Sequence, residues 1–199
     1  IQALCSDSMG NIYASGNMSN SSFLPYIAKW NGNMWSQFGV FNNSITALSI
    51  DALGNFYAGG YFTNASGKKY VSKWNGINWS ELGGMNSLAA NSNINSICSD
   101  SFGNIYTAGN FTNSSGKAYV AKWNGSAWSE LGGLNGLSAN LTIYTICSDS
   151  FGNIYAGGYF TNSSGNQYVA KWDGTSWSEL GGLNGLSANS EINSICSDA

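Results

Sequence analysis

The chain has 199 residues, carries a net charge of −3 and contains no histidine, and charged residues make up only 9% of it. Nucleic-acid binding depends on a basic stripe, which seven lysines scattered along the chain do not provide. No apolar run approaches the roughly 18 residues of a membrane-spanning helix, and no signal peptide is visible. The composition therefore predicts no nucleic-acid partner and no membrane insertion.

One unit of sequence is written out almost four times. Its aspartates at Asp100, Asp149 and Asp198 recur at a spacing of 49 residues, whereas Asp7 and Asp51 are 44 residues apart. One copy is therefore five residues shorter than the others. A period of this length is typical of propeller blades, which bury a continuous core only when they stack.

In the first copy, turn signals separate four short strands. We expect these strands over residues 1–7, 12–16, 26–30 and 34–38. The turn after the first strand contains Gly10, which is free to take positive φ, and the Asp7 carboxylate can accept hydrogen bonds from nearby backbone N–H groups. The dipeptide Asn31-Gly32 joins two aromatic-rich runs, which is among the strongest hairpin signals.

The later copies repeat this order from residues 45, 94 and 143. Their hairpins fall at Asn75-Gly76, Asn124-Gly125 and Asp173-Gly174. We expect no helix, because apolar residues alternate or come in short runs and glycine is frequent. The sequence thus predicts an all-β fold, a β-propeller of four-stranded antiparallel blades with a repeat of about 49 residues.

The blades are expected at residues 1–43, 44–92, 93–141 and 142–190. Residues 191–199 would form the first strand of a further blade. In a closed four-bladed ring that strand would compete with residues 1–7 for the same innermost position. We therefore expect either a larger ring, of about six to eight blades, or a ring closed between chains.

Four tryptophan pairs lie on the outer hairpins. They are Trp30/Trp35, Trp74/Trp79, Trp123/Trp128 and Trp172/Trp177. Residues five apart across a four-residue loop face each other, so each blade is expected to carry a directly opposed pair. These rings either fill the gap between adjacent blades or form platforms on which sugars stack between blades.

The recurring turn D-S-x-G-N and the four cysteines are both expected to stabilise the fold rather than to bind a ligand. The aspartate is expected to cap its turn; a Ca²⁺ site, the alternative, would have only one carboxylate per loop. Cys5, Cys98, Cys147 and Cys196 share one place in the repeat and are expected to be small buried hydrophobes, the alternative being a ring of thiols for a soft metal. Because the usual zinc spacings are absent, we predict no metal and no cofactor.

The order D-S-F-G-N-I-Y-A-G-G, then Y-V-A-K-W-N-G and W-S-E-L-G-G, resembles bacterial-type β-propeller repeats over the whole chain. This resemblance implies blades. The W-S-E-L-G-G strand is also similar to a strand of propeller lectins that hold a sugar between blades. Those lectins use His or Arg together with Trp as sugar contacts, and this chain contains neither His nor Arg.

No residue stands out as catalytic, because an active site normally breaks the symmetry of a repeat and the third and fourth copies match at about three quarters of positions. We therefore predict no enzyme. The first hypothesis is a non-enzymatic binding or assembly scaffold that presents polar loops on one propeller face to a protein partner or to further copies of itself. The alternative is a lectin that binds glycans in pockets between blades beside the Trp pairs. The candidate contact residues are Asn64, Lys68, Asn113, Lys117, Asn162, Trp79, Trp128 and Trp177.

Two features of the sequence favour different cellular compartments. Sequons such as Asn110-Phe111-Thr112 and Asn162-Ser163-Ser164 permit a secreted, glycosylated protein, which the family resemblance slightly favours. Unpaired cysteines favour a reducing compartment instead.

Overall fold

The computed structural model describes residues 1–198, which form four separate four-stranded antiparallel sheets in chain order. The first two sheets are β1 (Ala3–Ser6), β2 (Ile12–Ser15), β3 (Tyr26–Trp30) and β4 (Trp35–Val40), then β5 (Ile45–Ile50), β6 (Phe56–Gly60), β7 (Ser72–Trp74) and β8 (Trp79–Glu81). The last two are β9 (Ile94–Ser99), β10 (Ile105–Gly109), β11 (Ala121–Trp123) and β12 (Trp128–Glu130), then β13 (Ile143–Ser148), β14 (Ile154–Gly158), β15 (Ala170–Trp172) and β16 (Trp177–Glu179). Helical structure in residues 1–198 is limited to three single 3₁₀ turns, η1 (Gly84–Asn86), η2 (Gly133–Asn135) and η3 (Gly182–Asn184).

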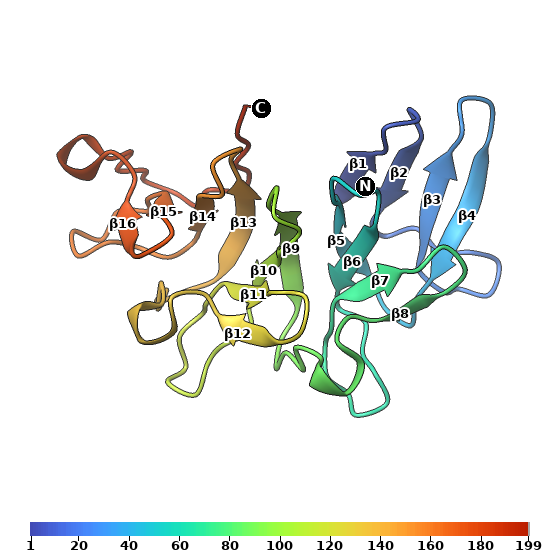
Figure 1. Cartoon of the computed structure of the whole chain (residues 1–199), viewed down its shortest axis with the longest axis horizontal. Coiled ribbons are helices and arrows are strands. Elements are labelled where there is room, and N and C mark those ends of the chain that lie inside the picture. Colours follow the sequence, from blue (N-terminus) through green and yellow to red (C-terminus); the bar gives the residue numbers. More distant parts are fainter. Residues whose placement is uncertain (199) are drawn as a thin grey trace.

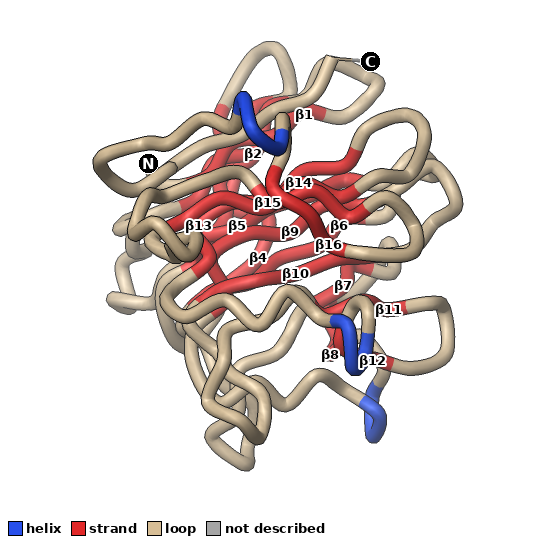
Figure 2. Tube along the Cα trace, turned by 90° about the vertical axis from the view of Figure 1, so that its left-hand side faces the viewer, coloured by secondary structure: helices blue, strands red, loops and turns tan. Residues whose placement is uncertain are grey.

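The sheets fan out around a common middle (Figure 1). The first strand of each sheet lies innermost, so that β1 contacts β5, β5 contacts β9 and β9 contacts β13. Figure 2 shows the same strands stacked one behind another and the loops gathered around them. The protein is a β-propeller of four-stranded blades, as its sequence predicts.

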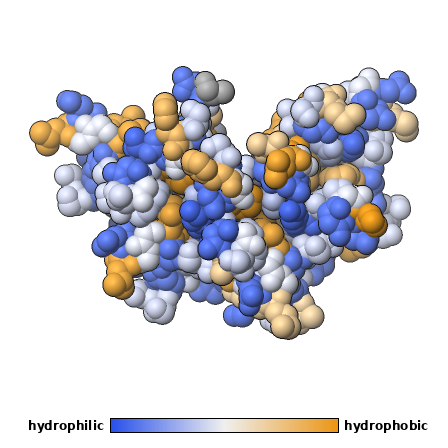
Figure 3. Space-filling model, viewed as in Figure 1, coloured by the Kyte–Doolittle hydropathy of each residue, from blue (hydrophilic) through white to orange (hydrophobic). Residues whose placement is uncertain are grey.

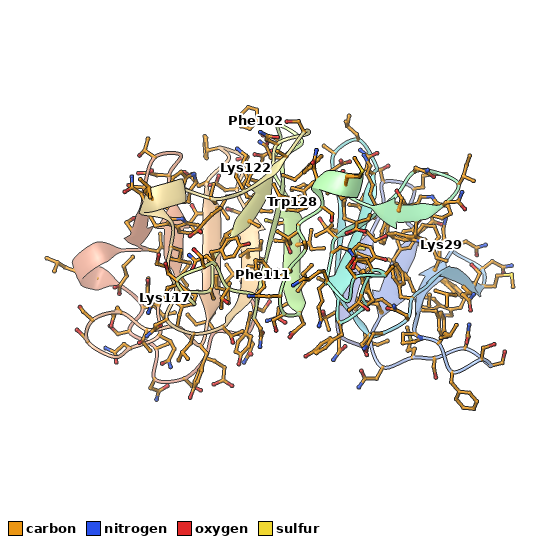
Figure 4. The ribbon with its side chains drawn as sticks, turned by 90° about the horizontal axis from the view of Figure 1, so that it is seen from below. Lys29, Phe102, Phe111, Lys117, Lys122 and Trp128 are labelled. Carbon is orange, nitrogen blue, oxygen red and sulfur yellow. The ribbon has the colours of Figure 1, made fainter. Side chains whose placement is uncertain are left out.

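The hydrophobic core lies between blades rather than within them. Each of three buried clusters combines side chains from two successive copies; one joins Ala108 and Val120 of the third copy to Ile143 and Ile146 of the fourth. Phe111, in the interior in Figure 4, is completely buried between the second and third sheets. No single sheet therefore encloses a core of its own, and stacking supplies the burial that ordering each blade requires.

Every D-S-x-G-N turn is held by its aspartate. In the third copy, Asp100 accepts hydrogen bonds from the backbone N–H groups of Phe102 and Asn104, both at 2.9 Å, and from the Tyr106 hydroxyl at 2.8 Å. Burial opposes ionisation of the equivalent Asp7, yet the hydrogen bonds from its turn lower the pKa of that carboxyl overall. The predicted capping role is confirmed.

The two ends of the array leave apolar surface uncovered. Ile1 is 71% exposed, whereas Ile45, Ile94 and Ile143 at the same place in the repeat are completely buried. Leu180 in the last blade is 43% exposed, but the equivalent Leu131 is only 6% exposed. Figure 3 shows a notch in the molecule between these ends, with hydrophobic side chains along its rim.

The segment expected as a further first strand, 191–199, is described as far as residue 198. Residues 191–198 do not form a regular strand, because no second strand in the described part of the chain pairs with them. They nevertheless occupy the corresponding position on the fourth blade. The hydroxyl of Ser197 donates to the carbonyl oxygen of Ser148 at 2.6 Å, just as Ser148 donates to Ser99 at 2.7 Å. That this segment begins a further blade stays a prediction.

We predict that Gly132→Ala destabilises the fold far more than Gly133→Ala. Both glycines have positive φ, but a Cβ on Gly132 would lie 2.8 Å from the Asn135 carbonyl oxygen and 2.9 Å from the Trp172 ring of the next blade, whereas a Cβ on Gly133 would meet nothing within 4 Å. The strain of positive φ alone costs about 1–2 kcal/mol, and the additional overlap raises the expected loss at Gly132 to about 3 kcal/mol. Urea unfolding of both variants measures the difference; equal losses would contradict it.

Candidate functional site

The tryptophan pairs close the seams between blades. Trp123 and Trp128 are directly paired across the hairpin of the third blade, with ring centroids 5.7 Å apart. The indole N–H of Trp128 donates to the carbonyl oxygen of Leu82 in the preceding blade at 3.3 Å, and the Trp123 ring packs on Gly83. The expected opposed pairs are therefore confirmed, and the rings do fill the space between adjacent blades.

A cavity remains beside the second tryptophan of the pair at two successive seams. Between the second and third blades it measures about 520 Å³ and is lined by Asn86, Ser87, Leu88, Asn113, Tyr119, Ala127, Trp128, Ser129 and Glu130. Between the third and fourth it measures about 370 Å³, with Asn135, Gly136, Leu137, Asn162, Ser163, Tyr168, Ala170, Trp177, Ser178 and Glu179 as its lining. Eight of these lining positions recur 49 residues apart, seven of them with the same residue, so the two cavities are copies of one site.

Each cavity has one wall from each blade. The earlier blade supplies the residues at the end of its 3₁₀ turn, η1 or η2, which follows a glycine in the left-handed conformation. The later blade supplies its outermost strand, β12 or β16, together with the loop that precedes its third strand. The full site therefore forms where two blades meet, whereas the equivalent residues of the first blade, which has no preceding blade within residues 1–198, line a smaller cavity of about 230 Å³.

The acidic group of the cavity is held by an asparagine. The side-chain amide of Asn113 donates to both carboxylate oxygens of Glu130, at 3.3 and 3.2 Å, and Asn162 does the same for Glu179. The side-chain oxygen Oδ1 of Asn113 accepts hydrogen bonds from the backbone N–H groups of Ser115 and Lys117, which fixes the loop. Both glutamates thus line their cavities from the outermost strand of the later blade.

A tyrosine stands next to this carboxylate. Burial, and then the nearby Glu130, raises the pKa of Tyr119, and burial together with Glu179 raises the pKa of Tyr168 in the same way. Both phenols therefore stay protonated around neutral pH and can donate as well as accept a hydrogen bond.

The first seam is built differently because the first copy is five residues shorter. It lacks the 3₁₀ turn, and Phe41 packs against Trp79 with ring centroids 5.4 Å apart. In the first blade the glutamate is also replaced by Gln37, whose side-chain oxygen accepts from Asn20 at 3.2 Å. The first blade thus keeps the Asn-to-side-chain contact without a charge.

The structure brings together some of the sequence-predicted contact residues. Asn113 and Trp128 share one cavity, and Asn162 and Trp177 share the other. Trp79 and Asn64 belong to the second blade at the first seam, where Asn64 donates to Glu81 at 3.0 Å. Their part in binding stays a prediction.

The two lysines among the predicted contacts, Lys68 and Lys117, have exposed side chains, and their backbone N–H groups donate to the asparagine of their own loop. In Figure 4 the loop of Lys117 lies at the opposite edge of the propeller from the turn of Phe102. Sequence reasoning did not select Tyr119, Tyr168, Glu130 or Glu179 as contacts, although their recurrence at the repeat spacing was the available signal.

Within residues 1–198, no three His, Cys, Asp or Glu side chains gather as metal ligands. Burial raises the pKa of the Cys5 thiol to about 12, and the nearby Asp7 adds a smaller effect. Burial, and then the nearby Cys196, raises the pKa of the Cys147 thiol to about 11. Thiols with such pKa values are protonated and poorly nucleophilic at neutral pH. No helix in the described part of the chain is long and apolar enough to cross a membrane.

Comparison with known proteins identifies β-propellers by structure. Neither protein-family models nor curated protein sequences give a match. PorZ, a surface component of the type-IX secretion system of Porphyromonas gingivalis, is similar over 85% of this chain with a TM-score of 0.59 and 12% identity. The six-bladed fucose-binding lectin of Aleuria aurantia is similar over 84% with a TM-score of 0.53 and 18% identity.

A protein described as a candidate gluconolactonase is similar over 88% of this chain, with a TM-score of 0.55 and 11% identity. The chain spans only 24% of PorZ, 54% of the lectin and 59% of the candidate gluconolactonase. At these identities the likeness concerns the fold, which hosts binding proteins as well as enzymes.

We predict that Glu130→Gln leaves stability nearly unchanged, whereas Glu130→Ala costs about 1 kcal/mol. Glutamine keeps an acceptor for the Asn113 amide, as Gln37 does for Asn20 in the first blade, while alanine leaves that half-buried amide without its partner. Chemical denaturation of the two variants and of the wild type measures both values. A similar loss in both variants would show that the charge, rather than the hydrogen bond, holds the loop.

Proposed function

We propose that this chain is a non-enzymatic binding propeller that holds carbohydrate in the cavities between its blades. The observation that carries the proposal is the repeated site itself, in which an indole, a phenol, an asparagine and a glutamate line the same space at two successive seams. One such arrangement could be incidental to packing, but its recurrence ties it to the repeat.

The chemistry of the cavity suits a sugar. Aromatic rings offer apolar surface to the C–H groups of a pyranose ring, and their polar tips hydrogen-bond at the rim. The Glu130 carboxylate accepts hydrogen bonds from hydroxyl groups, and the Tyr119 hydroxyl both donates and accepts. Volumes of about 520 and 370 Å³ are those of small-ligand sites.

Similarity in fold to a fucose lectin is compatible with this function. Two equivalent sites on one chain also allow two weak contacts with one glycan to act together. Such avidity can exceed the affinity of a single site by about 10²–10⁴ when the geometry permits both contacts.

We predict that replacing Trp128 and Trp177 together with leucine weakens glycan binding at least tenfold, because the stacking surface of both cavities is lost. A glycan array identifies a ligand, and calorimetric titration of the purified protein measures the loss. The control is Phe23→Leu, which changes an exposed aromatic side chain of the first blade that lines neither cavity. Thermal unfolding checks that the double variant remains folded; no sugar binding by the wild type at millimolar concentration would reject the function.

A second candidate function, a scaffold for a protein partner or further copies, is favoured by the loop tips. Met85, Leu134 and Leu183 stand at the same place in the repeat and are essentially fully exposed. They lie on the face of the Lys117 loop, since Ala118 of that loop pairs with Ala139 of the Leu134 connection. Large apolar side chains gathered on a face are typical of interaction surfaces, and the D-S-x-G-N-type turns carry a second such row at Met9, Leu53, Phe102 and Phe151.

We predict that changing Met85, Leu134 and Leu183 to serine abolishes any concentration-dependent self-association or partner binding on this face. Sedimentation velocity across a range of concentrations measures the association. The matched control changes Leu53, Phe102 and Phe151 to serine; these exposed side chains lie in turns between the first and second strands of their blades, at the other end of the strands from the Lys117 loop. Association that persists in the first triple variant and disappears in the control would place the interface on the other face.

A further inference from the structure

We propose that the two interblade cavities select saccharides that carry a protonated amine, and that Glu130 and Glu179 are the selecting groups. This inference rests on the proposed carbohydrate-binding function and specifies its ligand class. It comes from the distribution of charge around the cavities.

Each cavity contains one carboxylate and no cation. Among the described residues that line them, Glu130 and Glu179 are the only ones charged at neutral pH, and no lysine is present. The chain also has no arginine or histidine that could move in to neutralise them. A half-buried negative charge without a counter-ion favours a ligand that supplies one.

The carboxylates have free capacity to bind a ligand. Glu130 accepts one amide group, at 3.3 and 3.2 Å, whereas an ionised carboxylate offers about four acceptor positions. An ammonium group has three donors and makes stronger hydrogen bonds to a carboxylate than a neutral hydroxyl does. Glu130 is therefore a better partner for an amine than for any neutral sugar substituent.

Aromatic rings favour the same ligand. Trp128 and Tyr119 line the cavity with Glu130, and ring faces attract ammonium groups. The fold already contains such contacts elsewhere: the Lys122 ammonium lies 5.6 Å from the centre of the Tyr106 ring, and Lys171 lies 5.7 Å from that of Tyr155. Uronic and sialic acids, by contrast, would place a second negative charge beside the glutamate.

The first blade provides an internal comparison. Gln37 replaces the glutamate there and keeps the contact with its asparagine, Asn20. Glutamate is therefore not needed to hold the loop. The charge recurs in the second, third and fourth copies as Glu81, Glu130 and Glu179, and the last two line the cavities.

The experiment is calorimetric titration of the wild-type protein with the glucosamine tetramer and with its fully N-acetylated counterpart, at pH 6 and at two salt concentrations. We expect the amine-bearing tetramer to bind at least tenfold more tightly, with a preference that decreases as salt increases. In the double variant Glu130→Gln/Glu179→Gln, the two tetramers should bind with similar affinity, and the affinity for the N-acetylated tetramer should stay within about twofold of wild type.

The matched control is Glu81→Gln/Glu191→Gln. It changes the net charge equally, but Glu81 lies at the seam where Phe41 packs against Trp79, and Glu191 lies in the exposed terminal segment. The control should keep the preference for the amine, which separates recognition in the cavities from general attraction to an acidic protein.

The outcomes separate the two proposals. Equal binding of both tetramers by the wild type, or a preference that survives in Glu130→Gln/Glu179→Gln, overturns the amine selection and leaves carbohydrate binding standing. Failure of both tetramers and of all arrayed glycans to bind overturns the proposed function and the inference together.

Discussion

The hydrogen bond from a tryptophan indole to the backbone of the preceding blade is the interaction on which the rest of the structure depends. It recurs at 3.4, 3.3 and 3.3 Å from Trp79, Trp128 and Trp177. An isolated blade would leave this N–H and the apolar ring to water, and would have no core of its own to offset the entropy of ordering. Blades are therefore stable only as neighbours. The close fit of the Trp123 ring on Gly83 fixes the distance between two successive blades, and so determines how wide the space beside the seam can be.

Equivalent seams contain either a cavity or a packed aromatic contact. The length of the connection after the outermost strand of the earlier blade decides which of the two forms. In the longer copies, the glycine pair after the outermost strand starts a 3₁₀ turn that stands away from the next blade and forms one wall of the cavity. The shorter first copy lacks this turn, and Phe41 occupies the position that Ala90 and Ala139 have in the longer copies, where it packs on Trp79. Five residues of loop therefore separate a structural seam from a candidate binding site.

The sequence was sufficient for the fold because the signals that define blades are local and repeated. Turn chemistry at Asp100 and hairpin chemistry at Asn124-Gly125 fix the strand boundaries, and the register of Trp123 against Trp128 follows from loop length. The cavities could not be derived in this way, since their walls come from residues far apart in the chain, such as Leu88 and Trp128. The direction of the Glu130 side chain is equally non-local, because the hydrogen bond that orients it comes from Asn113, 17 residues away.

A cavity made from two blades couples ligand binding to the integrity of the seam. A molecule that contacts the 3₁₀ turn of one blade and the outermost strand of the next binds only when the two are docked, so it stabilises the docked state by mass action. At 100 times its dissociation constant a ligand adds about 2.7 kcal/mol in this way, which is comparable to the cost of the glycine substitutions that disturb the seam. The third blade belongs to both sites, because its outermost strand lines one cavity and its 3₁₀ turn lines the other. Glu130 of the first cavity lies against Gly136 in the wall of the second, so the repeat links neighbouring binding sites through the blade that they share.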